Sequence, residues 1–153
     1  MAKQSVLYVP KGYRDSGVVI LPADLFIAAN GGTAPTNTKQ LLAAGADDSN
    51  IKSITISSDS TAAHIVQFWK SLDGGTTKHL LCAVNVPIGS GFLSGTTVNI
   101  DVLSSAVVLG FPLDMSGKPF LPIATGTTIW VGVTIAAVTA SKTIYIHASV
   151  EDY

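Results

Sequence analysis

The chain has 153 residues and a net charge of −1, and charged residues make up only 12% of it, against about 25% in ordinary soluble domains. Its eight lysines are scattered singly from Lys3 to Lys142, so the sequence offers no cationic cluster for a nucleic-acid backbone. No apolar run reaches the roughly 18 residues of a membrane-spanning helix. Nucleic acid and membrane are therefore not expected as partners, and the length suits one folded domain.

Short hydroxyl side chains take the place of the missing charges, since the chain has 15 serines and 15 threonines. They lose little rotamer entropy when a neighbouring molecule covers them, and removing them from water costs far less than removing a charge. A net charge near zero also gives little repulsion between copies. We interpret this surface as one that is largely covered by other subunits. A β-sandwich with a Ser/Thr-rich exterior is the simpler alternative.

Residues 1–17 contain an apolar island, Val6–Val9, between polar flanks rich in Pro and Gly. This pattern fits an arm that lies on a neighbouring subunit, and it fits an edge strand equally well. We therefore divide the chain into an N-terminal arm or edge strand (1–17) and a single β-sandwich domain (18–153).

Three short elements are predicted before the centre of the chain. Residues 18–21 are a continuous apolar run that ends at Pro22 and indicates a strand. Residues 24–29 fit either a strand, which we favour, or one helical turn capped by Asp24. Residues 39–45 indicate a short strand that ends at a glycine.

The central stretch contains the strongest local signal. Residues 51–58 and 63–69 have strand character, and Ile54 and Ile56 alternate with Ser and Thr as in a strand with one buried face. Asp73–Thr76 is a Gly-rich turn that favours a hairpin. The strand after it, residues 79–86, is expected to place four side chains on its apolar face: Leu80, Cys82, Val84 and Val86.

Further strands are predicted after this hairpin. Residues 98–102, 127–135 and 144–150 alternate with period 2, and residues 120–122 read as an edge segment because Pro122 cannot donate to a ladder. Residues 104–109 fit a helical turn or a strand. The whole pattern predicts an all-β fold, an antiparallel β-sandwich or jelly roll of about eight strands.

The run from Ala29 to Pro87 also carries a resemblance. An Ala-Gly-Ala turn region precedes an I-x-x-I-x-I strand, a second strand follows, and then a D-G-G turn and an L-L-x-x-V-x-V-P strand. This order is similar to a group of small tailed-bacteriophage virion proteins. Where that group has an Asn-Gly turn, this chain has Asp47–Asn50, so this loop is longer or differently shaped. The resemblance implies a place in a phage particle, with the capsid favoured, and no enzymatic activity.

The sequence carries no recognisable catalytic or metal-binding motif. Gly89-Ser90-Gly91 lacks the outer spacing of a nucleophile elbow, and one glutamate, Glu151, cannot form a glutamate pair. His64, His79 and His147 lie on predicted strands without the spacing of a metal site. Cys82 has no partner for an intramolecular disulfide, and we expect a buried thiol. We therefore expect no enzyme and no cofactor.

The tryptophans leave three interpretations open. Trp130 alternates away from Ile129 and Val131, so it is second-layer core, an interface anchor or, together with Trp69, a glycan-stacking platform. The residues that we expect at a subunit interface are Val6, Leu7, Tyr8, Val9, Tyr13 and Trp130.

Together, the residues and the resemblance predict a non-enzymatic capsid decoration or cement protein that stabilises a phage shell through subunit contacts. It would be made in the bacterial cytoplasm, since the first residues lack the apolar core of a signal peptide, and would end on the virion. The expected partners are the major capsid protein and further copies of the chain, in a trimer or another symmetric oligomer. The alternatives are a carbohydrate-binding module and a structural protein of the tail, collar or baseplate.

Overall fold

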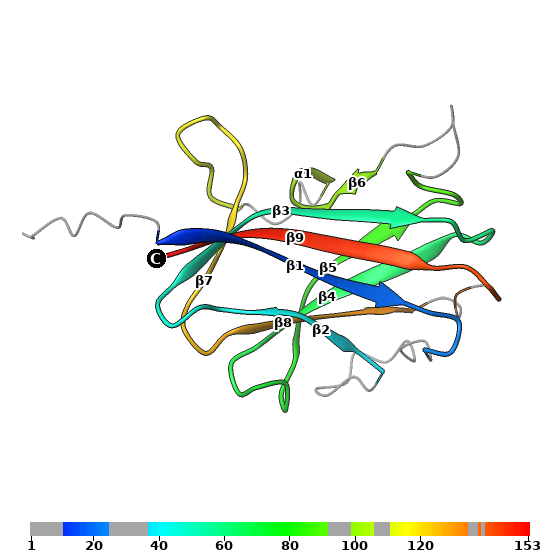
Figure 1. The fold of residues 1–153 in the computed structure, drawn as a ribbon, viewed down its shortest axis with the longest axis horizontal. Helices are drawn as coiled ribbons and strands as arrows, with labels where there is room; N and C mark the ends of the chain where they lie inside the picture. Colours follow the sequence, from blue (N-terminus) through cyan, green and yellow to red (C-terminus); the bar gives the residue numbers. More distant parts are fainter. Residues whose placement is uncertain (1–10, 25–36, 92–98, 106–110, 135–137, 139) are drawn as a thin grey trace, which may run out of the picture.

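The computed structural model describes residues 11–24, 37–91, 99–105, 111–134, 138 and 140–153. These residues form two antiparallel sheets that pack face to face (Figure 1), so the predicted all-β sandwich is confirmed. The helix α1 (Val102–Ser105) has only four residues, and no helix in the described ranges is long and apolar enough to cross a membrane.

The two sheets are built from strands distant in sequence. In the first sheet the order is β1 (Gly12–Ile20), β9 (Ile144–Asp152) and β3 (Ser49–Ser58). The other edge of β3 pairs with both β6 (Ile100–Asp101) and β7 (Leu121–Ile123). In the second sheet the order is β2 (Lys39–Ala43), β8 (Thr128–Val133), β4 (His64–Ser71) and β5 (His79–Val86). The predicted hairpin is present as β4 and β5, with Gly74 and Gly75 at positive φ in its loop.

The core lies between the sheets and follows the predicted alternation. On β9 every second residue from Ile144 to Val150 is buried, while Tyr145 and His147 face outward. Ile129, Val131 and Val133 of β8 cover the same core from the opposite sheet. Because side chains alternate across a strand, one buried face is enough to fix the pairing register of these strands.

Three β-bulges interrupt this alternation, and each has one extra residue opposite a single partner: Leu41, Lys52 and Leu81. The bulge at Leu81 corrects the predicted apolar face of β5. Leu80 lies opposite Trp69 on the outer face of the second sheet and is half exposed, whereas Val84 and Val86 are buried as expected. The bulge at Leu41 leaves both Leu41 and Leu42 in the core.

Side chains close the corner where the edge strands β1 and β2 of the two sheets meet. Arg14 donates to the carbonyl of Ala43, and Ser16 Oγ donates to the carbonyl of Leu41. In the reverse direction, Lys39 Nζ donates to the carbonyl of Val19 at 2.9 Å. These bonds occupy edge carbonyls that would otherwise be available to a strand of another molecule.

Other expectations were met in part. β1 runs without a break through the boundary that we expected after residue 17, so this position is not a structural boundary. The strand expected at 98–102 is reduced to Ile100–Asp101, because Val102 begins α1, where the Asp101 carboxylate accepts the amide of Leu103. Most of the segments 24–29 and 104–109 lie outside the described residues, although α1 supplies the helical turn at 104 and 105. The edge position of Pro122 is as predicted.

We predict that Phe68→Ala lowers the free energy of unfolding by about 3–5 kcal/mol, because Phe68 is among the largest fully buried side chains and its removal leaves a cavity. Urea denaturation with an unchanged m-value measures this loss. Leu72→Ala, at an exposed position, serves as the control and should shift stability by no more than about 0.5 kcal/mol. A loss below about 1 kcal/mol at Phe68 would contradict this account of the core.

Candidate functional site

A loop with an apolar tip stands away from both sheets between α1 and β7. Its described residues, Phe111–Phe120, are called here the 111–120 loop, yellow in Figure 1. Met115 is fully exposed and Leu113 is 62% exposed. Their exposure at the tip of a protruding loop makes this loop the candidate contact surface.

The loop is nevertheless tightly organised, and Asp114 is its centre. One carboxylate oxygen, Oδ1, accepts the Ser116 amide (2.9 Å), the Ser116 hydroxyl (2.7 Å) and the Lys118 amide (3.0 Å). Backbone bonds from Asp114 N to Lys118 O and from Phe120 N to Pro112 O close the loop further. The Ser116 hydroxyl, followed by the Lys118 amide, holds the pKa of Asp114 well below its ordinary value of 3.8.

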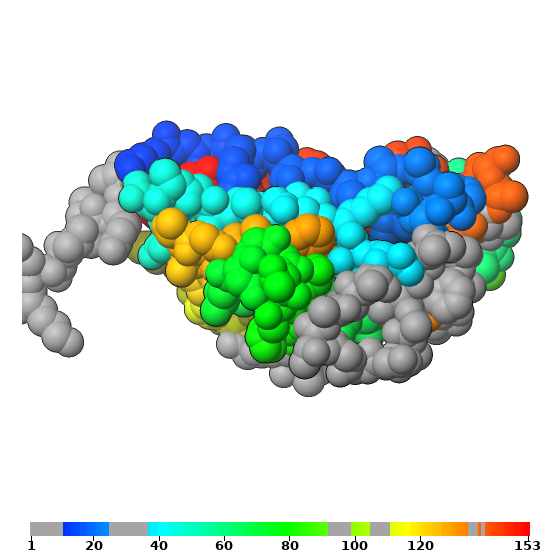
Figure 2. Space-filling model, turned by 90° about the horizontal axis from the view of Figure 1, so that it is seen from below, coloured from blue at the N-terminus to red at the C-terminus, as the bar shows by residue number. Residues whose placement is uncertain are grey.

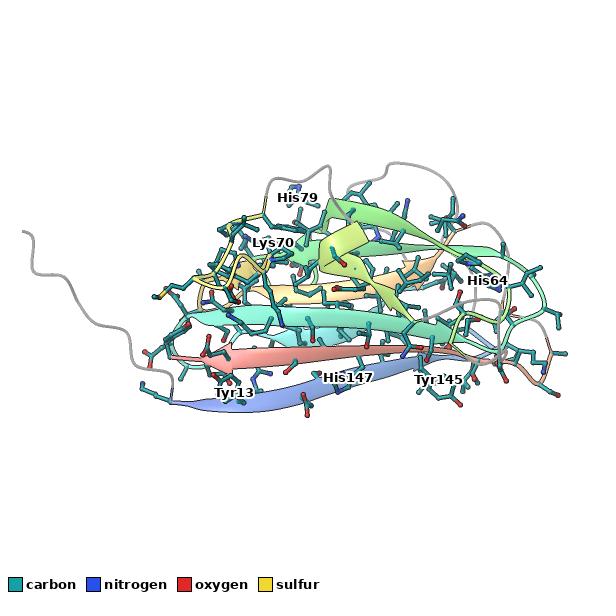
Figure 3. The ribbon with its side chains drawn as sticks, turned by 90° about the horizontal axis from the view of Figure 1, so that it is seen from above. Tyr13, His64, Lys70, His79, Tyr145 and His147 are labelled. Atoms are coloured by element: carbon teal, nitrogen blue, oxygen red, sulfur yellow. The ribbon has the colours of Figure 1, made fainter. Side chains whose placement is uncertain are left out.

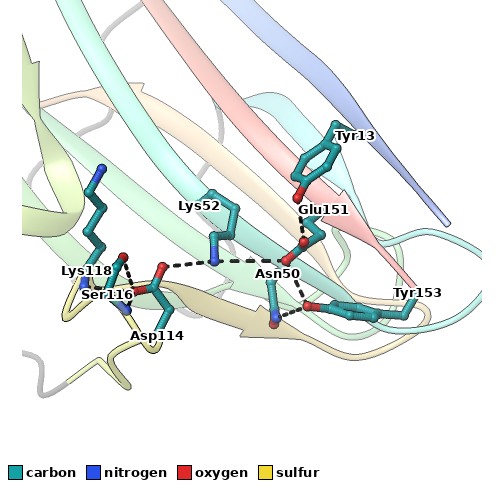
Figure 4. Close-up of polar contacts among 8 residues, drawn as sticks. All are labelled: Tyr13, Asn50, Lys52, Asp114, Ser116, Lys118, Glu151 and Tyr153. Carbon is teal, nitrogen blue, oxygen red and sulfur yellow. Dashed lines mark hydrogen bonds and ion pairs between the residues drawn. The ribbon is translucent and has the colours of Figure 1, made fainter. Parts of the chain in front are cut away.

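Lys52 joins this loop to the first sheet. The bulge in β3 leaves Lys52 as the extra residue between Ile51 and Ser53, and its ammonium lies 3.2 Å from Asp114 Oδ2 and 3.9 Å from Glu151 Oε2 (Figure 4). The same ammonium lies 5.4 Å from the ring centroid of Phe120, at the end of the loop. Alternation with the buried Ile51 places Lys52 on the outer face of the sheet, and the bulge then returns Ile54 to the core.

Glu151, the one glutamate of the chain, is buried on β9 and completes the network. Its Oε1 accepts the Tyr13 hydroxyl at 2.9 Å, and its Oε2 accepts the Tyr153 hydroxyl at 2.8 Å. Asn50 donates its amide to the Tyr153 oxygen at 2.8 Å. The hydrogen bond to Glu151 raises the pKa of Tyr13, and burial followed by the bond to Glu151 raises that of Tyr153. Four polar side chains are therefore fixed around one carboxylate at the base of the loop.

Beside this network the sandwich has a groove of about 540 Å³. Pro122, Ile123 and Ala124 supply its apolar lining, and the polar lining comes from Asp48, Ser49, Asn50, Lys70 and Tyr153. Thr125 N donates to Asp48 Oδ1 and Tyr153 N donates to the Asp48 carbonyl. The groove therefore has well-anchored polar groups and an apolar portion, a combination suited to recognition.

The outer face of the first sheet is flat and carries few charges. Tyr13, Tyr145 and His147 point outward from β1 and β9 (Figure 3), between small side chains such as Ser53, Thr55, Ser57 and Ser149. Tyr13 is 73% exposed, so its predicted place at an interface is sterically open and stays a prediction. His147 Nε2 lies 3.7 Å from Asp15 Oδ1.

The two tryptophans of the chain both lie on the second sheet. They are direct neighbours, Trp69 on β4 opposite Trp130 on β8. Trp69 is only 4% exposed, so it offers no ring face to a sugar and the predicted platform is wrong at this residue. Over the half-buried Trp130 the Lys78 ammonium lies 4.7 Å from the ring centroid, and a Cβ at Gly75 would lie 2.3 Å from its Cζ2. The 72–78 loop that covers this ring forms the green protrusion in Figure 2.

The remaining predicted residues do not come together into a chemical site. Val6, Leu7, Tyr8 and Val9 lie outside the described residues. Among the described ones, His64 is buried with its Nε2 2.7 Å from Ser60 Oγ, and no three His, Cys, Asp or Glu side chains are grouped as metal ligands. Cys82 is partly buried, and this burial raises the pKa of its thiol to about 11.

Sequence reasoning missed the residues that form the 111–120 loop and its anchor: Lys52, Leu113, Asp114, Met115, Glu151 and Tyr153. One signal was present, because Ile51 and Ile54 are separated by two residues while Ile54 and Ile56 are separated by one. In a strand with a single buried face, this spacing indicates a bulge that leaves two consecutive residues, Lys52 and Ser53, on the outer side. The sequence Asp114-Met-Ser-Gly117 likewise indicates an Asp-centred turn.

We predict that Asp114→Ala accelerates amide hydrogen exchange at Ser116 and Lys118 by roughly tenfold, because it removes a charged acceptor. Since the pKa of Asp114 is depressed in the folded chain, its stabilisation is complete above about pH 4 and is lost as the pH falls through the lowered pKa. Asp73→Ala is a matched control, because Asp73 organises the 72–78 loop in the same way and should leave Ser116 and Lys118 unchanged. Equal exchange in wild type and Asp114→Ala would contradict the role of this carboxylate.

We also predict that Glu151→Gln lowers the pH at which Tyr13 and Tyr153 ionise, because the neighbouring negative charge disappears while the shape is kept. Ultraviolet absorbance of the phenolate during an alkaline titration measures this shift, and Tyr13→Phe assigns one of the two transitions. Identical titration curves for wild type and Glu151→Gln would show that the carboxylate does not control these phenols.

A scan of the sequence against protein-family models finds no matching family, and a search of curated proteins finds no matching relative.

Proposed function

We propose that the chain is a structural subunit of a bacteriophage particle and that it decorates or cements the capsid. The observation that carries a binding role is the 111–120 loop, whose exposed Leu113 and Met115 are held by Asp114 and Lys52. A loop that is ordered before contact loses less conformational entropy on association than a loose one. We expect such an ordered loop in a segment that binds a partner, rather than in one that only connects two strands.

The order of the strands supports the jelly-roll form of the sandwich. The connections β1–β2, β2–β3, β3–β4, β5–β6, β7–β8 and β8–β9 each pass from one sheet to the other. Such repeated crossing is the connectivity of a double Greek key, and jelly rolls of this kind occur in viral capsid and lectin domains. Fold alone does not decide between these uses, so the phage assignment depends on the resemblance of residues 29–87.

The surface chemistry favours contact with protein over contact with sugar. Charges are few, the outer face of the first sheet is lined with Ser and Thr, and exposed apolar residues stand at Leu72, Leu113 and Met115. Trp69 is buried and Trp130 is covered by Gly75 and Lys78, so the two aromatic rings considered for glycan stacking are not open. The major capsid protein and further copies of the chain are the proposed partners.

Particles produced with and without this chain test the proposal. We predict that the protein is present in purified particles at a copy number that follows the capsid symmetry, and that electron microscopy places its density on the shell. Because each contact adds to a repeated array, shells that lack the protein should open at a lower temperature, measured by release of DNA on heating.

Absence of the protein from purified particles would overturn the proposal. Density confined to the tail, collar or baseplate would overturn the capsid role and leave a structural role elsewhere in the particle. A matched control is the same particle supplied with the protein again in trans, which should restore the original release temperature.

A further inference from the structure

We propose that two copies of the chain pair around a two-fold axis, with the 111–120 loop of each copy seated in the groove of the other. This inference names the surfaces through which copies of the chain contact each other, a contact that is part of the proposed function. It rests on that function only for its biological setting. Its test uses the purified protein alone, so it fails or succeeds independently of the particle experiment.

The loop has the properties of an inserting element. It carries Met115 and Leu113, both exposed, on a short hairpin closed by the Leu113–Pro119 bridge. Methionine is unbranched and adapts to irregular apolar surfaces. Asp114 fixes the backbone on which both side chains stand, so docking requires little further ordering.

The groove has the properties of a receptor for such a tip. Its volume of about 540 Å³ lies within the range of about 300–1,000 Å³ typical of binding pockets. The exposed Pro122 and Ala124 supply the apolar surface for Met115 and Leu113. Polar groups from Asp48, Asn50, Lys70 and Tyr153 supply a rim, as at protein interfaces.

The loop and the groove offer one pair of opposite charges, Lys118 and Asp48, while the groove also carries the Lys70 ammonium. Lys118 is exposed on the loop and forms no ion pair in the part of the chain that the structure describes. Asp48 is exposed at the groove, with Oδ1 bonded to the neutral amide of Thr125. A loop seated in the groove brings this ammonium toward this carboxylate, which favours the correct register over other apolar contacts.

The position of the two elements on one molecule favours reciprocal exchange. β7, of only three residues, connects the loop to Ala124 in the groove, so the two are roughly 10 Å apart along the chain at about 3.3 Å per residue. In a two-fold pair the same patch serves both copies, and each loop–groove contact occurs twice. Pairing through the edge of β7 is blocked instead, because Pro122 at its centre has no amide hydrogen.

Disulfide trapping between different variants tests the contact directly. In a Cys82→Ala background, Met115→Cys protein is mixed with Ala124→Cys protein under mild oxidation, and we expect a cross-linked heterodimer because a disulfide requires close Cα atoms. Leu72→Cys mixed with Ala124→Cys is the matched control, since Leu72 is as exposed (68%) as Leu113 but stands on the 72–78 loop. Equal cross-linking in both mixtures would overturn the proposal.

Sedimentation velocity supplies the second readout. Wild type should form a dimer whose dissociation constant rises at least about 30-fold in Met115→Asp, while Leu72→Asp leaves it unchanged and both variants keep the wild-type circular dichroism spectrum. A monomer at every concentration would overturn the proposal, and a trimer would overturn the two-fold geometry. A dimer that survives Met115→Asp but disappears when residues 1–10 are removed would overturn it in favour of the N-terminal segment as occupant.

Discussion

The placement of one cation, Lys52, governs how the surface of this sandwich is organised. Lys52 is the extra residue of the bulge in β3, between the buried Ile51 and Ile54, and its ammonium reaches Asp114 on the loop and Glu151 on β9. A buried carboxylate needs a cation or several donors nearby, because its separation from water is otherwise unfavourable. Lys52, Tyr13 and Tyr153 together supply this environment to Glu151. The same lysine therefore stabilises a polar group at the sheet and holds the base of an apolar loop.

The chain limits the unspecific association that its composition favours. A nearly uncharged protein with exposed apolar side chains lacks the repulsion that keeps copies apart, and the open edges of its sheets would invite disordered association. The chain closes the β1–β2 corner with Arg14, Ser16 and Lys39, and it places Pro122 in the edge strand β7. Backbone pairing is discouraged at these edges, so the exposed side chains of the 111–120 loop remain as a directed contact.

The sequence predicts the core better than the surface, for a physical reason. One buried face imposes alternation, so β3, β8 and β9 could be located from their apolar residues alone. Leu80 departs from this pattern because the bulge at Leu81 puts it on the opposite face from Val84 and Val86, and pairing partners far along the chain decide where a bulge forms. Trp69 was misjudged because it is buried although it lies outside the core between the sheets, and alternation does not reveal burial on an outer face. Met115 was missed because apolar character alone does not distinguish a buried residue from one exposed at a loop tip.

The hydrogen bonds that organise the 111–120 loop join residues that are close in the sequence. Asp114 bonds to residues two and four positions later in its own loop, so much of the order of the loop is local. Lys52 holds the loop to the first sheet, and Phe111 packs against the core. A contact element built this way can change its tip residues without disturbing the core, because Leu113 and Met115 carry no part of the fold. Binding specificity and folding stability are then set by different residues, and a single weak contact becomes effective through repetition when many copies are arranged in one assembly.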